Sequence, residues 1–183
     1  INSNISFRHK ILLMLIYFAL KTSLETLLSP KSIAVIGASN SPEKIGSIVI
    51  KNILASGYVG KIYPINPKEK KIQNIDCYSE IGKLPNIPDL VIVSVPSAVV
   101  IPVIEESINF GVKNYLVFSA GFKESGVDGI ELEKTLVNLI SENDCKLLGP
   151  NCLGFANNDL PLNATFGQVI KQKGNVRFVS QSG

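Results

Sequence analysis

The sequence predicts an α/β fold, a doubly wound parallel sheet followed by the start of a second α/β domain. Its strands are short apolar runs rich in β-branched residues, which is typical of parallel strands buried on both faces. Segments with helical periodicity separate these runs, and that alternation favours right-handed crossovers between about five parallel strands. We expect the strands at 33–36, 61–67, 90–95, 114–120 and 146–149.

The helices are expected between these strands. Pro42 and Glu43 fit the first turn of one helix, whose periodicity runs from Lys44 and stops at Gly57. Outside the main series, a short peripheral strand is expected at 72–78 and a loop at 122–129. Further helices are expected at 22–30, 98–110 and 130–140, the last with the clearest amphipathic pattern.

The N-terminal part divides into an apolar extension at 1–22 and the main domain at 23–154. The apolar run from Ile11 to Leu20 is about half of what spans a bilayer, so we expect no membrane partner. A signal peptide contains a run of that length, but no convincing cleavage site follows it. We therefore interpret residues 1–22 as an extension that lies outside the main domain.

The C-terminal part has a different pattern. Residues 155–174 show no strong period and are interpreted as a connector, and 175–183 as the start of a truncated second domain. Because the chain begins with Ile1 and ends at Gly183 directly after a strand-like run, we interpret it as a fragment of a longer protein.

Composition excludes several classes of function. A net charge of +3 over 183 residues, with scattered basic residues, argues against a nucleic-acid partner. Cys77, Cys145 and Cys152 lack metal-ligand spacing, so we expect no metal site and reduced thiols in a cytoplasmic protein. No Ser–His–Asp set or pair of carboxylates is visible either, and we therefore assign no catalytic residue.

The stretch from Ser32 to Gly46 predicts a phosphate-binding loop, because a strand, a glycine-containing loop and a helix N-terminus present unpaired N–H groups to an anion. The dinucleotide motif GxGxxG would need glycines where Ser39 and Pro42 stand, so the cofactor is not identified by the loop. A tight turn without a ligand is the alternative. The candidate phosphate-binding residues are Gly37, Ser39, Asn40, Ser41, Pro42, Lys44 and Gly46.

The residues after the second strand help to distinguish among cofactors. An NAD site usually has an acid there, whereas this chain has Asn66, Pro67 and Lys68. A lysine at this place suits a ribose phosphate, which both NADP and coenzyme A carry, although a solvated surface lysine is the alternative. Small side chains at the ends of later strands leave room for an adenine or a pantetheine arm. These residues are Val95, Pro96, Ser119, Ala120 and Gly121. Glu124, in the loop after Gly121, is a candidate acid.

Six motifs occur in order over 27–183: SPKSIAVIGAS with PEKIG, NPK at Asn66, VSVP, SAGFKESG, LGPNCLG and SQSG. Together they resemble the CoA-binding domain of NDP-forming acyl-CoA synthetases, such as ADP-forming acetate–CoA ligase (an acetyl-CoA synthetase). The α subunit of succinyl-CoA synthetase is a more distant relative, and the same domain opens some protein lysine acetyltransferases.

The resemblance implies a Rossmann-like domain that binds coenzyme A. The loop from Gly37 to Gly46 would hold the CoA phosphates, Lys68 would approach the phosphorylated ribose, and Asn151 would face the reaction centre. The remaining residues from Val95 to Gly121 would border the nucleotide and the thiol arm.

The resemblance also implies a reaction from acyl-CoA, phosphate and NDP to a carboxylic acid, CoA and NTP, through an acyl phosphate and a phosphohistidine. That histidine, the ATP-grasp domain or β subunit, and the ADP/ATP and Mg sites would lie in parts beyond Gly183, so the chain alone is expected to be inactive. The full-length protein would be an oligomer. A regulatory CoA-binding module, the front of a lysine acetyltransferase and an NADP-dependent oxidoreductase are the alternatives.

Overall fold

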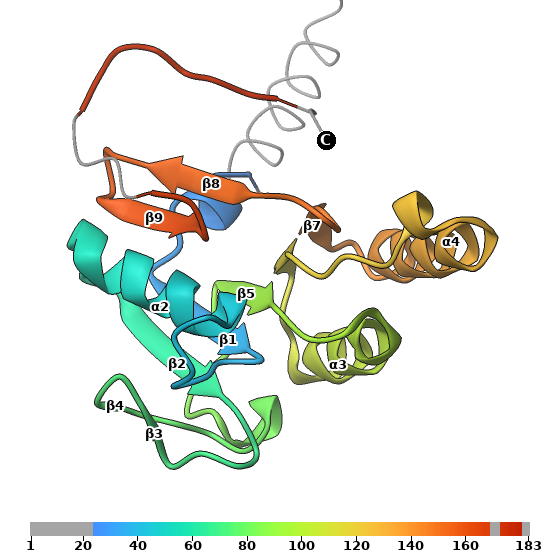
Figure 1. Cartoon of the computed structure of the whole chain (residues 1–183), viewed down its shortest axis with the longest axis horizontal. Coiled ribbons are helices and arrows are strands. Elements are labelled where there is room, and N and C mark those ends of the chain that lie inside the picture. Colours follow the sequence, from blue (N-terminus) through green and yellow to red (C-terminus); the bar gives the residue numbers. More distant parts are fainter. Residues whose placement is uncertain (1–23, 169–172, 181–183) are drawn as a thin grey trace, which may run out of the picture.

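The computed structural model describes residues 24–168 and 173–180. A five-stranded parallel sheet in the order β2-β1-β5-β6-β7 forms its centre (Figure 1), which confirms the predicted doubly wound α/β fold. The chain passes from β1 to β2 on one side and then crosses to β5 on the other, so the topological switch point lies between β1 and β5. The strands are β1 (Ser32–Ile36), β2 (Lys61–Ile65), β5 (Leu90–Val93), β6 (Asn114–Val117) and β7 (Lys146–Leu148).

Helices cover both faces of the sheet. α2 (Ile45–Ser56) lies on one face, and α3 (Ser97–Phe110) and α4 (Val127–Glu142) lie on the other (Figure 1). Alternate side chains of β1 enter two separate apolar clusters, which explains its unbroken apolar sequence. Ile33 and Val35 pack in the cluster beside α2, and Ala34 and Ile36 pack in the cluster beside α3 and α4.

A β-hairpin completes the face that α2 covers. β8 (Gly154–Asn157) and β9 (Leu162–Thr165) pair antiparallel and lie beside α2 (Figure 1). The side chains of Leu162 and Ala164 are fully buried in the same cluster as Ile33. Residues 155–165, predicted to lie in a connector without a strong period, thus include this hairpin, whose four-residue strands are too short to give a clear period.

The hairpin is held to α2 by a buried amide. Asn52 Nδ2 donates hydrogen bonds to the backbone oxygens of Thr165 (2.9 Å) and Gly167 (2.7 Å). Replacing Asn52 with alanine would remove the donor of both bonds, so we expect the free energy of unfolding to fall by about 2 kcal/mol. Urea denaturation measures this loss. Asn138→Ala, on the exposed side of α4, is the control and should change stability by less than about 0.5 kcal/mol; equal effects would contradict the role of Asn52.

Several local elements differ from the predictions. α2 begins only at Ile45, so Pro42 and Glu43 lie in the turn before it. The peripheral strand expected at 72–78 is a hairpin of β3 (Lys71–Ile72) and β4 (Ile75–Asp76), because Gln73 and Asn74 adopt left-handed φ values of 48° and 69°. The loop expected at 122–129 instead contains a 3-10 helix, η2 (Lys123–Ser125), and the start of α4. A second 3-10 helix, η1, covers Ile81–Lys83.

The two ends of the described chain are less regular. Residues 24–28 are helical, as predicted, whereas 173–180 have no assigned strand and expose Val176, Phe178 and Val179. The start of a second domain at 175–183 therefore stays a prediction. The extension at 1–22 lies outside the described residues, and among the residues that are described no helix is long and apolar enough to cross a membrane.

Candidate functional site

The carboxyl ends of β1, β2 and β5 meet at Gly37. The Gly37 N–H donates to the backbone oxygen of Ile65 (3.2 Å), and the Ser94 N–H donates to the backbone oxygen of Ile36 (3.0 Å). The Ser94 hydroxyl lies 3.4 Å from the Gly37 oxygen, to which it donates. The loop predicted to bind phosphate therefore starts at the switch point, where sheets of this kind bind their ligands.

Two glycines let α2 approach this edge closely. Gly37 has a φ of 87°, and a Cβ there would lie 2.5 Å from the backbone oxygen of Ser94. A Cβ at Gly46, in the first turn of α2, would collide with the Gly37 oxygen and lie 2.9 Å from Ser94 Oγ. Only hydrogen atoms fit at both positions, so the helix N-terminus is held against the loop. The role of Ser94 was not predicted, because no spacing rule links it to the two glycines.

Two backbone N–H groups at the start of α2 have no acceptor in the part of the chain that the structure describes. Lys44 is the N-cap and makes no side-chain capping bond, and the N–H groups of Ile45 and Gly46 have no acceptor among the described residues. Unpaired N–H groups and the helix dipole attract an anion at such an end. Ser39, which is buried, accepts a hydrogen bond at Oγ from the Ser41 N–H (3.0 Å) and so shapes the preceding loop.

The Asn40 side chain forms hydrogen bonds with other residues of the protein. Its amide donates to the Lys71 oxygen (2.9 Å) and to a Glu69 carboxylate oxygen (3.1 Å), and its own oxygen accepts from the Gln73 N–H (3.2 Å). Gln73 in turn donates to the backbone oxygen of Ser47 (2.8 Å). The β3–β4 hairpin is thereby held against the candidate phosphate loop, a function of Asn40 that sequence patterns could not reveal.

The turn after β2 places a lysine beside the same loop. Asn66 Nδ2 donates to the Ala38 oxygen (2.7 Å), and Asn66 Oδ1 accepts from the Lys68 N–H (2.9 Å). Pro67 and Lys68 are exposed, and within the described ranges the Lys68 amine has no ion-pair partner. The Lys68 amine is therefore available to pair with an anionic ligand.

The other predicted site residues form a second group, after β5, β6 and β7. The Ser119 hydroxyl donates to the Val95 oxygen, and the Ser119 oxygen accepts from the Asn151 N–H (3.1 Å). Gly121 packs against Ser97, because a Cβ at Gly121 would lie 2.6 Å from Ser97 Oγ. These bonds join three loops along the edge of the sheet. Pro96, Ala120 and Asn151 are exposed there.

The thiols are poorly suited to nucleophilic chemistry. Burial raises the pKa of Cys77, Cys145 and Cys152, so all three are protonated at neutral pH. The part of the chain that the structure describes contains no cluster of His, Cys, Asp and Glu able to hold a metal ion. The edge of the sheet therefore suits an anionic ligand better than a reactive thiol.

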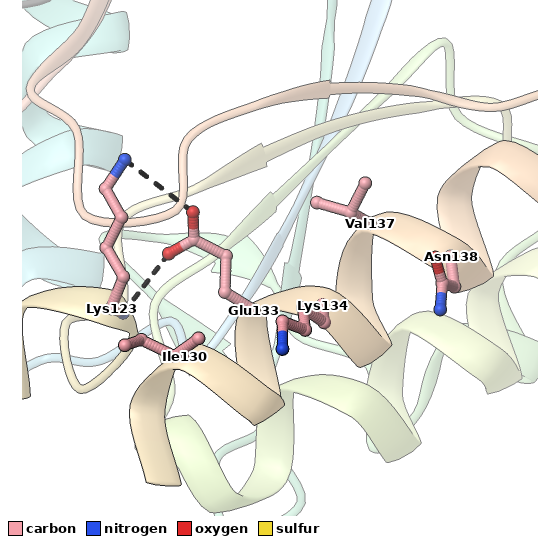
Figure 2. A pocket seen from close by; sticks show the side chains of 6 residues that line it. All are labelled: Lys123, Ile130, Glu133, Lys134, Val137 and Asn138. Carbon is pink, nitrogen blue, oxygen red and sulfur yellow. Dashed lines mark hydrogen bonds and ion pairs between the residues drawn. The ribbon is translucent and has the colours of Figure 1, made fainter. Parts of the chain in front are cut away.

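A shallow groove lies elsewhere, on the outer face of α4. Figure 2 shows its lining, in which Lys123 and Glu133 interact at one end. None of the predicted site residues belongs to it, and it lacks the unpaired backbone donors of the α2 N-terminus. The edge of the sheet is therefore the stronger candidate for the functional site. The groove is lined by Lys123, Ile130, Glu133, Lys134, Val137 and Asn138.

The parallel sheet and its flanking helices define a Rossmann-like domain, and the unpaired N–H groups at the α2 N-terminus suit an anionic ligand. Residues 31–158 match the family model of the CoA binding domain, and the chain belongs to that family.

Similar proteins agree with this assignment. The chain is 42% identical over 160 residues to ADP-forming acetate–CoA ligase I of Archaeoglobus fulgidus, covering 87% of the chain and 23% of the relative. It is also 42% identical to the α subunit of ADP-forming acetate–CoA ligase II of Pyrococcus furiosus, covering 87% of the chain and 35% of the relative. The chain thus spans about a quarter to a third of these relatives.

Solved structures give the same result. Acetyl-coenzyme A synthetase 1 of Candidatus Korarchaeum cryptofilum, in complex with phosphate and ADP, has a TM-score of 0.76 at 42% identity. That comparison covers 79% of this chain and 31% of the other. The resemblance to ADP-forming synthetases inferred from the six motifs is confirmed.

Proposed function

We propose that this chain is the CoA-binding part of an ADP-forming acyl-CoA synthetase, with acetate–CoA ligase as the specific activity. The observation that carries the proposal is the α2 N-terminus, whose N–H groups at Ile45 and Gly46 are unpaired within the described residues and packed against Gly37. The names of the relatives, which are ligases, support a synthetase over an oxidoreductase or an acetyltransferase.

In this proposal the two groups of predicted site residues bind different parts of CoA. The loop from Gly37 to Gly46 holds the diphosphate through backbone N–H groups, and Lys68 meets the phosphate on the ribose. The second group of residues, around Val95 and Gly121, borders the nucleotide and the pantetheine arm with its thiol, and Asn151 faces the reaction centre. CoA supplies the thiol that takes or releases the acyl group.

The rest of the reaction belongs, in this proposal, to parts of the full-length protein outside the 183 residues. In the proposal, ADP, ATP and Mg bind an ATP-grasp domain or β subunit, and a small carboxylic acid is the other substrate. We propose further that the full-length protein is a cytoplasmic oligomer. The isolated chain binds CoA and completes no turnover.

Lys68 gives the proposal a selective test. Lys68→Ala should weaken the binding of CoA by about fivefold and leave dephospho-CoA unchanged, because only CoA carries the phosphate on its ribose. Isothermal titration calorimetry of both ligands measures the difference. Lys61→Ala removes an exposed lysine at the opposite end of β2 and should affect neither ligand.

Parallel titrations of the unmodified chain with CoA, NADP and NAD test the ligand class itself. Binding of CoA alone supports the proposal. Binding of NADP without CoA would overturn it in favour of an oxidoreductase, and equal losses for CoA and dephospho-CoA in Lys68→Ala would refute the role of the lysine.

A further inference from the structure

Consecutive backbone N–H groups in the loop after β6 donate to carboxylates of the protein. Glu124 Oε1 accepts from the N–H groups of Gly121 (2.6 Å) and Phe122 (3.2 Å). Glu133, on α4, accepts from the Lys123 N–H at Oε2 (3.2 Å). Three successive donors are thus fixed by two acidic side chains, so the conformation of the loop depends on both of them.

The bonds from Gly121 and Phe122 also act on the charge of Glu124. Because the Gly121 N–H, above all, stabilises the ionised form, the pKa of Glu124 lies below its usual range. The carboxylate is therefore charged at neutral pH, and hydrogen bonds to a charged acceptor are stronger than those to a neutral one.

The two carboxylates hold different halves of the loop. Glu133 and Lys123 also form an ion pair, with 3.8 Å between Nζ and Oε1 (Figure 2). The Phe122 side chain is fully buried, and a Cβ at Gly129 would collide with the Phe122 oxygen, so this half is anchored on α4 without Glu124. Glu124 by contrast fixes the part of the loop before Phe122, at residues 119–121.

The segment 119–121 lies at the carboxyl edge of the sheet. Gly121 has a φ of 101° and packs on Ser97, the first residue of α3. Ser119, two residues earlier, is bonded to the loops after β5 and β7 through Val95 and Asn151. A loss of the Glu124 bonds therefore loosens the segment 119–121 where three loops meet.

We propose that Glu124 is a positioning residue for CoA, which holds the segment 119–121 in the shape that borders the pantetheine arm. This proposal rests on the proposed function, because it presumes that CoA binds at this edge. Glu124 touches no ligand itself. It acts through the N–H groups of Gly121 and Phe122. The alternative is that Glu124 only caps η2 and has no effect on ligand binding.

The test compares two ligands on the 183-residue chain. Glu124→Ala should weaken CoA by about tenfold and leave adenosine 3′,5′-bisphosphate, which lacks the arm, unchanged. Glu124→Gln keeps an oxygen acceptor without the charge and should lie between Glu124→Ala and the unmodified chain. Glu131→Ala removes an exposed carboxylate on α4 and is the control. The melting temperatures of Glu124→Gln and Glu131→Ala should stay within about 2 °C of that of the unmodified chain.

The results separate the two proposals. Unaltered CoA affinity in Glu124→Ala would overturn the positioning role while leaving CoA binding intact. Equal losses for both ligands together with a lower melting temperature would also overturn it, in favour of a purely structural cap. An unmodified chain that binds neither ligand would overturn the proposed function, and the positioning role with it.

Discussion

Replacing Gly46 with alanine should lower the free energy of unfolding by about 3 kcal/mol and abolish CoA binding. The added Cβ would collide with the backbone oxygen of Gly37 and lie 2.9 Å from Ser94 Oγ. A backbone oxygen cannot rotate away, so α2 would have to move off the end of β1. Because the same movement displaces the N–H groups at the start of α2, stability and ligand binding should fall together. Urea denaturation and calorimetry with CoA measure the two effects.

Gly82→Ala provides the control for this substitution. Gly82 lies in η1, and a Cβ there would meet nothing within 4 Å. The change should therefore alter the free energy of unfolding by less than about 1 kcal/mol and leave CoA binding intact. Equal stabilities of the Gly46 and Gly82 variants would show that α2 does not pack against Gly37 as the structure has it.

The second large effect is expected from Ile45→Pro, which should weaken CoA by about tenfold or more while the fold is kept. Proline removes the N–H of Ile45, for which the described residues offer no acceptor, so no internal hydrogen bond is lost. The first helical position accepts proline, and Lys44 before it has φ −80° and ψ 138°, the extended conformation that a following proline requires.

Ile45→Ala is the matched control, because it shortens the same side chain and keeps the N–H. It should bind CoA like the unmodified chain, and both variants should melt at similar temperatures. If Ile45→Pro and Ile45→Ala bound CoA equally well, the backbone donor at the α2 N-terminus would have no part in holding phosphate.

The strands and the candidate loop could be predicted because their signals are local. A parallel strand buried on both faces is an uninterrupted apolar run, and β1 shows such a run directly before Gly37. The spacing of Gly37 and Gly46 around a helix start likewise lies within one stretch of sequence. These features need no knowledge of distant contacts.

The remaining features depend on distant residues. Ser94 contacts both glycines only because β5 lies beside β1, and Asn40 bonds to Lys71 and Gln73 across a turn made by residues with positive φ. Strands β8 and β9 have four residues each, and they are stabilised by packing on α2, which no local period reveals. The elements that sequence patterns missed are therefore stabilised by tertiary contacts.

The central claim is that CoA binds at the carboxyl edge of the sheet, with its phosphates on the α2 N-terminus. Titration of the ¹⁵N-labelled chain with CoA, followed by amide chemical shifts, tests it most directly. We predict the largest changes at the amides of Gly37, Ile45 and Gly46, with smaller changes around Gly121. Changes confined to the α4 groove, at Ile130 and Val137, or no change at any amide, would contradict the account.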